Sequence, residues 1–292
     1  MLKIIFFGTP QEVVPVLESL VKHFTVVAVV TTPDQKAGRR QLLTPPPIKV
    51  AAQKYNIPVF QPVTLSSTAS LSKLPTADLY VVAAYGKLIP NDILQTPHYG
   101  AINIHPSLLP MYRGATPIQT ALLNGDRTTG ITIIKMDNQM DHGPILHQLS
   151  YKLEETDTFE LLMKKMFTQA AMILPHVIEE YTSGRLTPQP QDESKATYTK
   201  MITKEDGYID LSKIKTLNAV EIENWKLKIA RTIRAYYPWP SVWTKISMKN
   251  HEVRMKFLPN HQLQIEGKKP MSIQDFINGY PEMKEKIEKL YK

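Results

Sequence analysis

The sequence predicts an α/β fold with a mostly parallel sheet covered by helices on both faces, followed by a second, smaller domain. Near-continuous apolar runs such as residues 2–7 and 25–30 alternate with segments whose apolar residues recur at helical spacing. The chain has 292 residues, which is long enough for two domains. Its hydrophobic fraction of 42% and charged fraction of 21% are ordinary for a globular protein.

The later elements follow in the order that such a sheet requires. After the first two strands and the helix between them, the pattern predicts helices at 48–55, 116–124 and 157–181, and strands at 59–60, 78–83, 102–105, 130–136 and 144–153. Residues 183–204 are polar and contain prolines without an apolar period, which is typical of a linker. We therefore expect a catalytic domain at 1–182 and a second domain at 205–280.

The carboxyl-terminal region has the pattern of a small β domain. Asn218 and Glu221 resemble a capping box at the start of a helix. The strand candidates lie at 208–211, 242–248, 253–258 and 263–266. Residues 281–292, in which Lys and Glu alternate, are expected to form an exposed terminal helix.

The net charge of +8 is unevenly placed along the chain. Residues 1–189 carry +2, whereas residues 190–292 carry +6. A basic carboxyl-terminal third suits a polyanionic partner such as nucleic acid, although a lysine-rich solvated surface explains the same charge.

Cysteine usage and hydropathy restrict the class of protein further. The sequence has no cysteine, which excludes disulfides, thiolate metal sites and a cysteine nucleophile. This fits a reducing compartment, and we expect a cytoplasmic protein. No apolar run approaches the roughly 20 residues of a membrane-spanning helix, so we expect no membrane partner.

Residues 31–47 form an unusually long predicted loop. Connections longer than about 12–15 residues are usually functional or disordered. This one leaves the carboxyl end of a parallel strand, where α/β proteins bind ligands. Arg39 and Arg40 at its tip are suited to phosphate contacts, although a solvated tip is the plainer explanation.

The candidate catalytic residues lie at and near the carboxyl end of the predicted strand at 102–105. Asn103 and His105 are separated by one residue, so on an extended backbone both side chains leave the same face. Asp141 lies in a polar loop after the strand at 130–136, which could neighbour theirs. An amide, an imidazole and a carboxylate together suit stabilising an oxyanion while moving a proton. Taken singly, His105 reads as a turn residue and Asp141 as a turn cap.

No residue stands out as an enzyme nucleophile, since the G-x-S-x-G motif is absent. The three side chains therefore suit direct transfer between two bound substrates, with no covalent enzyme intermediate. His98, His142 and His147 show no regular ligand spacing, so we predict no metal site.

Two motifs carry a resemblance to a known family. The stretch Asn103-Ile-His-Pro-Ser-Leu-Leu-Pro110 and the later Asp141-His-Gly143 resemble the signature of folate-dependent formyltransferases. Three further segments are similar to members that act on methionyl-tRNA: Phe7-Gly-Thr-Pro10, the long loop at 31–47, and Arg234-Ala-Tyr-Tyr-Pro-Trp-Pro240.

The resemblance implies a reaction and assigns roles in it. The α-amine of initiator methionyl-tRNA would attack the formyl carbon of 10-formyltetrahydrofolate through a tetrahedral intermediate. Asn103 would stabilise the oxyanion and His105 would assist proton transfer. Asp141 would orient His105 or relay protons through water. Arg39 and Arg40 would contact tRNA phosphates. The residues implied to bind the folate are Ser107, Leu108, Leu109 and Pro110, with Tyr85, Gly86, Lys87 and Leu88 lining the pocket.

The resemblance also implies a Rossmann-like catalytic domain followed by an OB-like barrel. Only 49 residues follow Trp243, so we expect a shortened barrel. Where family members often have Gly-Lys-Lys, this chain has Arg40-Gln41-Leu42, which reduces the positive charge of the loop. We expect a monomer. The alternatives are a formyltransferase acting on a nucleotide-linked amino sugar and a non-catalytic RNA-binding protein.

Overall fold

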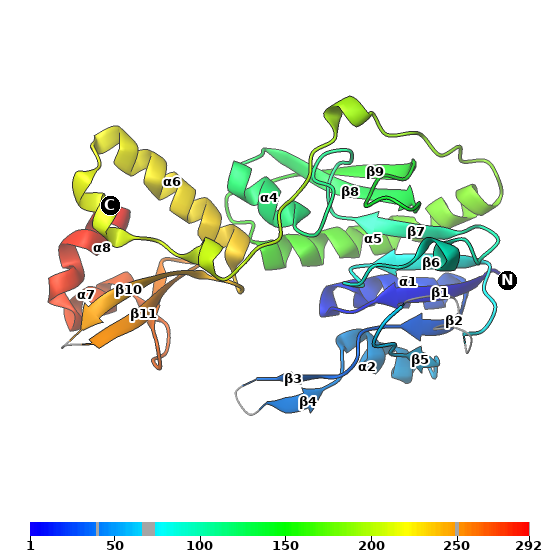
Figure 1. Ribbon diagram of the computed structural model, residues 1–292, viewed down its shortest axis with the longest axis horizontal. Coiled ribbons are helices and arrows are strands. Elements are labelled where there is room, and N and C mark those ends of the chain that lie inside the picture. The colour runs from blue at the N-terminus through cyan, green and yellow to red at the C-terminus, as the bar shows by residue number, and fades with distance from the viewer. Residues whose placement is uncertain (39–40, 66–73, 249–250, 292) are drawn as a thin grey trace. The chain divides into compact units, whose positions relative to one another are not determined.

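The computed structural model describes residues 1–38, 41–65, 74–248 and 251–291 (Figure 1). The chain divides into two compact units, the first formed by residues 1–117, 128–152 and 163–199, and the second by residues 118–127, 153–162 and 200–292.

The first unit is built on a seven-stranded sheet. In sheet order its strands are β5 (Val59–Phe60), β2 (Thr25–Val30), β1 (Lys3–Gly8), β6 (Leu79–Ala83), β7 (Ala101–His105), β8 (Thr128–Lys135) and β9 (Ile145–Lys152). The pairings from β5 to β7 are parallel, whereas β8 and β9 are antiparallel to their neighbours. The predicted mostly parallel sheet is confirmed.

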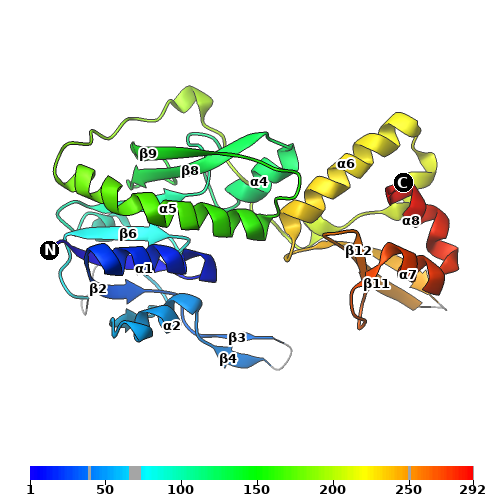
Figure 2. The same ribbon diagram turned by 180° about the vertical axis from the view of Figure 1, so that it is seen from behind.

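The central strands of this sheet are buried on both faces. Ile5 and Phe7 of β1 pack in a cluster with Ile93 of helix α3 (Asn91–Leu94), and Phe6, which points to the other face, is equally buried. Helices α1 (Val14–His23) and α5 (Phe159–Thr182) run over one face in Figure 2. The first two thirds of the chain also contain helices α2 (Pro47–Lys54) and α4 (Pro117–Asn124).

The described helices include none that could cross a membrane, since none is both long and apolar enough.

Parallel pairing places the carboxyl ends of β2, β1, β6 and β7 at one edge of the sheet. The segments that leave these ends are residues 31–47, 9–13, 84–90 and 106–116. Residues 85–88 and 105–110, which the sequence singles out, therefore lie along one edge, the usual ligand-binding edge of an open α/β sheet.

The expected long loop contains a short hairpin. Strands β3 (Gln35–Ala37) and β4 (Leu42–Thr44) pair antiparallel within residues 31–47. We call these two strands and their turn the arm. At its base, Asp34 accepts hydrogen bonds from Lys49 Nζ at 2.8 Å and Gln61 Nε2 at 2.7 Å. Periodicity does not reveal this ribbon, because each strand has only three residues.

The second unit contains an antiparallel sheet with the order β10 (Val242–Met248), β11 (His251–Leu258), β12 (Gln262–Ile265) and β13 (Met271–Ser272). Helices α6 (Ala219–Tyr236) and α7 (Ile273–Gly279) belong to the same unit. The capping box of α6 is confirmed: Glu221 N donates to Asn218 Oδ1 at 3.0 Å, and Asn218 N donates to Glu221 Oε2 at 2.8 Å.

Two expectations about this unit are wrong. Residues 208–211 do not form a strand: Tyr208 makes one isolated bridge to Trp243, and a 3-10 helix begins at Leu211. The terminal helix α8 (Lys284–Tyr291) exists but is not wholly exposed, since Ile287 and Leu290 are buried in the core of the unit. Ile287 and Leu290 are three residues apart and therefore lie on one face of the helix, but the many Lys and Glu residues around them make this apolar face hard to recognise in the sequence.

Candidate active site

The site is built on the carboxyl-terminal half of strand β7. Asn103 pairs with Val82 on one side and Ile134 on the other, so it lies in the middle of the sheet. His105, two residues later, points to the same side of the strand, as predicted. Only 5% of the His105 side chain is exposed, whereas Asn103 is half-buried.

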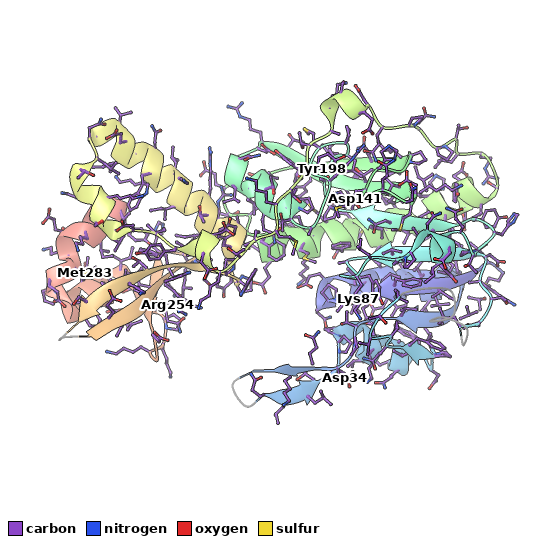
Figure 3. All side chains as sticks on the ribbon, viewed as in Figure 1. Asp34, Lys87, Asp141, Tyr198, Arg254 and Met283 are labelled. Carbon is purple, nitrogen blue, oxygen red and sulfur yellow. The ribbon has the colours of Figure 1, made fainter. Side chains whose placement is uncertain are left out.

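The structure brings the three predicted catalytic residues into contact, and Figure 3 labels one of them, Asp141. Asn103 Nδ2 donates to Asp141 Oδ1 over 3.4 Å, and His105 Nδ1 lies 3.5 Å from Asp141 Oδ2. Asp141 Oδ2 also accepts a hydrogen bond from Gly114 N at 2.8 Å. Strand β8 runs antiparallel to β7 with Lys135 opposite Ile102, so the loop after β8 begins beside the amino end of β7, and Asp141 within that loop extends to Asn103 and His105.

The hydrogen bonds of the imidazole fix its tautomer. His105 Nε2 lies 2.9 Å from the carbonyl oxygen of Tyr112. A carbonyl only accepts, so Nε2 carries the proton. In the neutral ring, Nδ1 therefore has a lone pair on the side of Asp141. If Nδ1 takes up a proton, the resulting cation faces a carboxylate, which stabilises it.

The segment after His105 is fixed to strand β8. Ser107 Oγ donates to the Met111 carbonyl at 2.7 Å, and Thr132 Oγ1 donates to the Ser107 carbonyl at 2.7 Å. Leu109 N donates to Thr132 Oγ1 at 3.0 Å. The side chains of Ser107 and Leu109 are buried, so they shape the loop, while Leu108 and Pro110 are half-buried.

Residues 85–88, the other implied folate segment, do not share one environment. Tyr85 lies in the core against Phe7, at a ring distance of 5.6 Å, and burial raises the pKa of its phenol to about 12. Lys87 Nζ donates to the carbonyls of Pro62 and Val63 at 2.8 Å. Gly86 and Leu88 are exposed. Of these four residues, only Gly86, Lys87 and Leu88 can line a surface.

The predicted phosphate contacts, Arg39 and Arg40, lie outside the described residues.

The sequence reasoning missed a group of residues behind Asp141. The Arg113 side chain is buried and is bonded to Gln191, Glu193 and Tyr198. Arg113 stands three residues beyond the first quoted motif, between Tyr112 and Gly114, which contact His105 and Asp141, and an arginine there was a usable signal. Gln191 and Glu193 lie in the segment expected to be a linker, where no periodicity marks them.

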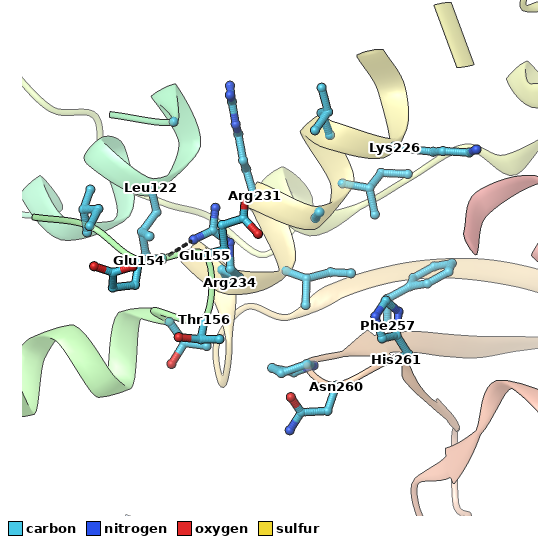
Figure 4. Close-up of a pocket in the computed structure, with 18 of the residues that line it drawn as sticks. Leu122, Glu154, Glu155, Thr156, Lys226, Arg231, Arg234, Phe257, Asn260 and His261 are labelled. Carbon is cyan, nitrogen blue, oxygen red and sulfur yellow. Dashed lines mark hydrogen bonds between the residues drawn. The ribbon is translucent and has the colours of Figure 1, made fainter. Parts of the chain in front are cut away.

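No group of three or more potential metal ligands occurs among the residues that the structure describes. A cavity of about 810 Å³ lies in the second unit, lined in part by Arg231, Arg234 and His261 (Figure 4). None of the three predicted catalytic residues lines it. Arg234 there donates to the Glu154 carbonyl at 3.3 Å, a contact that orders the protein's own backbone.

Comparisons with known proteins agree with these motifs. The model of the formyl transferase family matches residues 2–178. A methionyl-tRNA formyltransferase from Chloroflexus aggregans is 45% identical over 246 residues, covering 83% of this chain and 76% of the relative.

Two solved structures share the fold at low sequence identity. A 4-N formyltransferase from Francisella tularensis has a TM-score of 0.63 at 19% identity, covering 87% of this chain and 96% of that one. A methionyl-tRNA formyltransferase from Clostridium thermocellum has a TM-score of 0.57 at 18% identity, covering 93% of this chain and 96% of that one. With the sequence match over most of both chains, the protein belongs to the methionyl-tRNA formyltransferase family.

Proposed function

We propose that this chain transfers the formyl group of 10-formyltetrahydrofolate to the α-amine of initiator methionyl-tRNA. Family membership supports the reaction. The observation that carries the chemistry is the contact of Asn103, His105 and Asp141 at the carboxyl end of β7. An amide donor, an imidazole lone pair and a carboxylate are the groups that direct acyl transfer to an amine requires.

The geometry gives each residue a role. Among the residues that the structure describes, Asn103 Nδ2 has only a long hydrogen bond, of 3.4 Å, and can therefore donate to the oxyanion of the tetrahedral intermediate. Such a donor is worth about 3–4 kcal/mol of transition-state stabilisation. His105 Nδ1 accepts the proton that the attacking amine loses, because the proton on Nε2 is held by Tyr112. Asp141 orients and stabilises the imidazolium.

The fixed loop at 107–110 and the exposed residues of 86–88 fit the binding of the folate at the same edge of the sheet. Arg39 and Arg40 would contact phosphates of the tRNA. We assign catalysis to residues 1–182 and further tRNA contacts to the basic residues of 205–280, with 183–204 connecting them. The protein would act in the cytoplasm as a monomer, since one chain supplies all three catalytic side chains.

The test is formyl transfer from labelled 10-formyltetrahydrofolate to charged initiator tRNA. His105→Ala should lower kcat by about 100- to 10,000-fold without weakening tRNA binding, as expected for loss of a general base. His98 is an exposed histidine packed edge-to-face against Tyr99, so His98→Ala is the matched control and should have the activity of the wild type. Transfer to a nucleotide-linked amino sugar but not to tRNA would overturn the proposal.

A further inference from the structure

We propose that Gln191 is a positioning residue that holds Asp141 in its working place. This inference rests on the proposed function, because it assumes that the Asp141 carboxylate serves His105. Gln191 Nε2 donates to two backbone carbonyls, those of Asp141 and Gly143, both at 2.8 Å. One side chain thus fixes the backbone on both sides of His142.

Arg113 determines which way the Gln191 carboxamide points. Gln191 Oε1 accepts from Arg113 Nη2 at 2.8 Å and from Arg113 Nε at 3.1 Å. A guanidinium only donates, so the amide oxygen must face Arg113 and the amide NH₂ must face the two carbonyls. The orientation is therefore set by chemistry, and every strong hydrogen-bonding group of the carboxamide has a partner.

Arg113 is itself immobilised. Its side chain is fully buried, and a buried charge needs a partner. Glu193 pairs with it and raises the pKa of the guanidinium, with a further hydrogen bond to Tyr198. The backbone is held too, since Arg113 N donates to the Thr197 carbonyl at 2.8 Å, and Thr199 N to the Arg113 carbonyl at 2.8 Å.

The backbone at Asp141 needs such support. Its φ is +50°, in the left-handed region that is unfavourable for residues with a side chain. Surrounding contacts must hold a residue there. The carboxylate meets Asn103, His105 and Gly114, whereas the carbonyl meets Gln191. If the carbonyl is released, the carboxylate can move away from the imidazole.

Residues 189–199 therefore do more than connect two parts of the chain. Gln189 pairs with Ile145 through its backbone, Gln191 holds the Asp141 turn, and Thr197 and Thr199 pair with Arg113. The segment that reads as a linker supplies hydrogen bonds to the loops that carry the catalytic side chains. The site is incomplete without it.

Three variants test this role. Gln191→Ala removes the donor and should lower kcat by about 10- to 100-fold, the effect of a displacement on the order of 1 Å, with KM for both substrates unchanged. Gln191→Glu keeps an oxygen that accepts from Arg113, but it replaces the NH₂ donor with a carboxylate oxygen, which cannot donate to the carbonyls of Asp141 and Gly143 and is repelled by them. It should lower kcat at least as much while keeping the melting temperature. Gln189→Ala keeps the backbone pairing with Ile145, and among the described residues its side-chain amide donates only to the Thr187 carbonyl. It is the matched control and should have the kcat of the wild type.

A double-mutant cycle with Asp141→Asn separates this role from a merely structural one. If Gln191 acts through Asp141, Gln191→Ala should slow Asp141→Asn no further, within about twofold. Additive losses, or wild-type kcat in Gln191→Glu, would overturn the positioning role and leave the proposed function intact. Wild-type kcat in Asp141→Asn would instead overturn the assigned role of Asp141 and this inference with it.

Discussion

Two regions at the same edge of the main sheet differ in how they are held: the region around Asp141 is fixed by contacts from several segments, whereas the arm is fixed at its base. Around Asp141, polar groups from β7, the 106–116 loop and the 189–199 segment converge, and the side chains are largely buried. In the arm, the described side-chain contacts to other elements lie at the base, where Asp34 meets Lys49 and Gln61. Leu42 and Leu43 farther along are 62% and 69% exposed.

The difference fits the two proposed tasks, catalysis near Asp141 and tRNA binding by the arm. A proton moves only between groups placed to a fraction of an ångström, so a catalytic carboxylate needs contacts on its side chain and on its backbone. A segment that receives a large, charged partner needs accessible residues and an oriented base. We therefore expect changes near Asp141 to alter kcat, and changes in the arm to alter the KM for tRNA.

Between these two regions, the largest difference in kcat is expected from replacing one side-chain amide in each. Asn103→Ala should lower kcat by about 100- to 1000-fold, because it removes the proposed oxyanion donor. Gln41→Ala removes an amide that donates to the Gly38 carbonyl at 3.0 Å in the turn of the arm. It should leave kcat unchanged at saturating tRNA. Steady-state kinetics with varied tRNA measure both, and a kcat loss in Gln41→Ala would break the comparison.

An intermediate effect is expected from two glycines with positive φ. A Cβ at Gly114, whose φ is +113°, would lie 2.6 Å from Thr199 Oγ1, whereas a Cβ at Gly38, whose φ is +70°, meets no described atom within 4 Å. Gly114→Ala should cost about 1–3 kcal/mol of stability and also lower kcat, because Gly114 N donates to Asp141.

Gly38→Ala should cost only the backbone strain, about 1–2 kcal/mol at most, with kcat unchanged. Chemical denaturation and steady-state kinetics measure the pair. Equal kcat in the two variants would show that the contact between Gly114 and Asp141 is unimportant.

The smallest effect concerns pH and two carboxylates, one in each region. Arg113 lowers the pKa of Glu193, and hydrogen bonds from Gln61 and then Lys49 lower that of Asp34. A lowered pKa in the folded state stabilises the protein above the ordinary value, and this stabilisation is lost as the pH falls through the folded value. The ordinary values are 4.5 for Glu193 and 3.8 for Asp34.

Glu193→Gln and Asp34→Asn should therefore lower the melting temperature at pH 7. The deficit should shrink on acidification, beginning at a higher pH for Glu193→Gln. Because both carboxylates are solvent-accessible, the differences in melting temperature should be small. Melting curves from pH 7 to about pH 3 test this, and a deficit independent of pH would show that the ion pairs contribute nothing.

Much of the fold could be predicted because it depends on local patterns. The apolar runs that became β1, β2 and β6 are buried on both faces, which the sequence displays directly. The capping box at Asn218 needs only residues three apart. The arm and helix α8 were harder, since three-residue strands have no measurable period and charged residues masked the buried Ile287.

The sequence by itself determined the reactive groups of this protein: the i, i+2 spacing of Asn103 and His105 puts them on one face of any strand. Only the tertiary structure decided that Asp141 reaches them, because that depends on β7 and β8 being neighbours. It also decided that Gln191, 50 residues from Asp141, holds the Asp141 carbonyl. Contacts between distant residues arise from packing, and no local pattern records them.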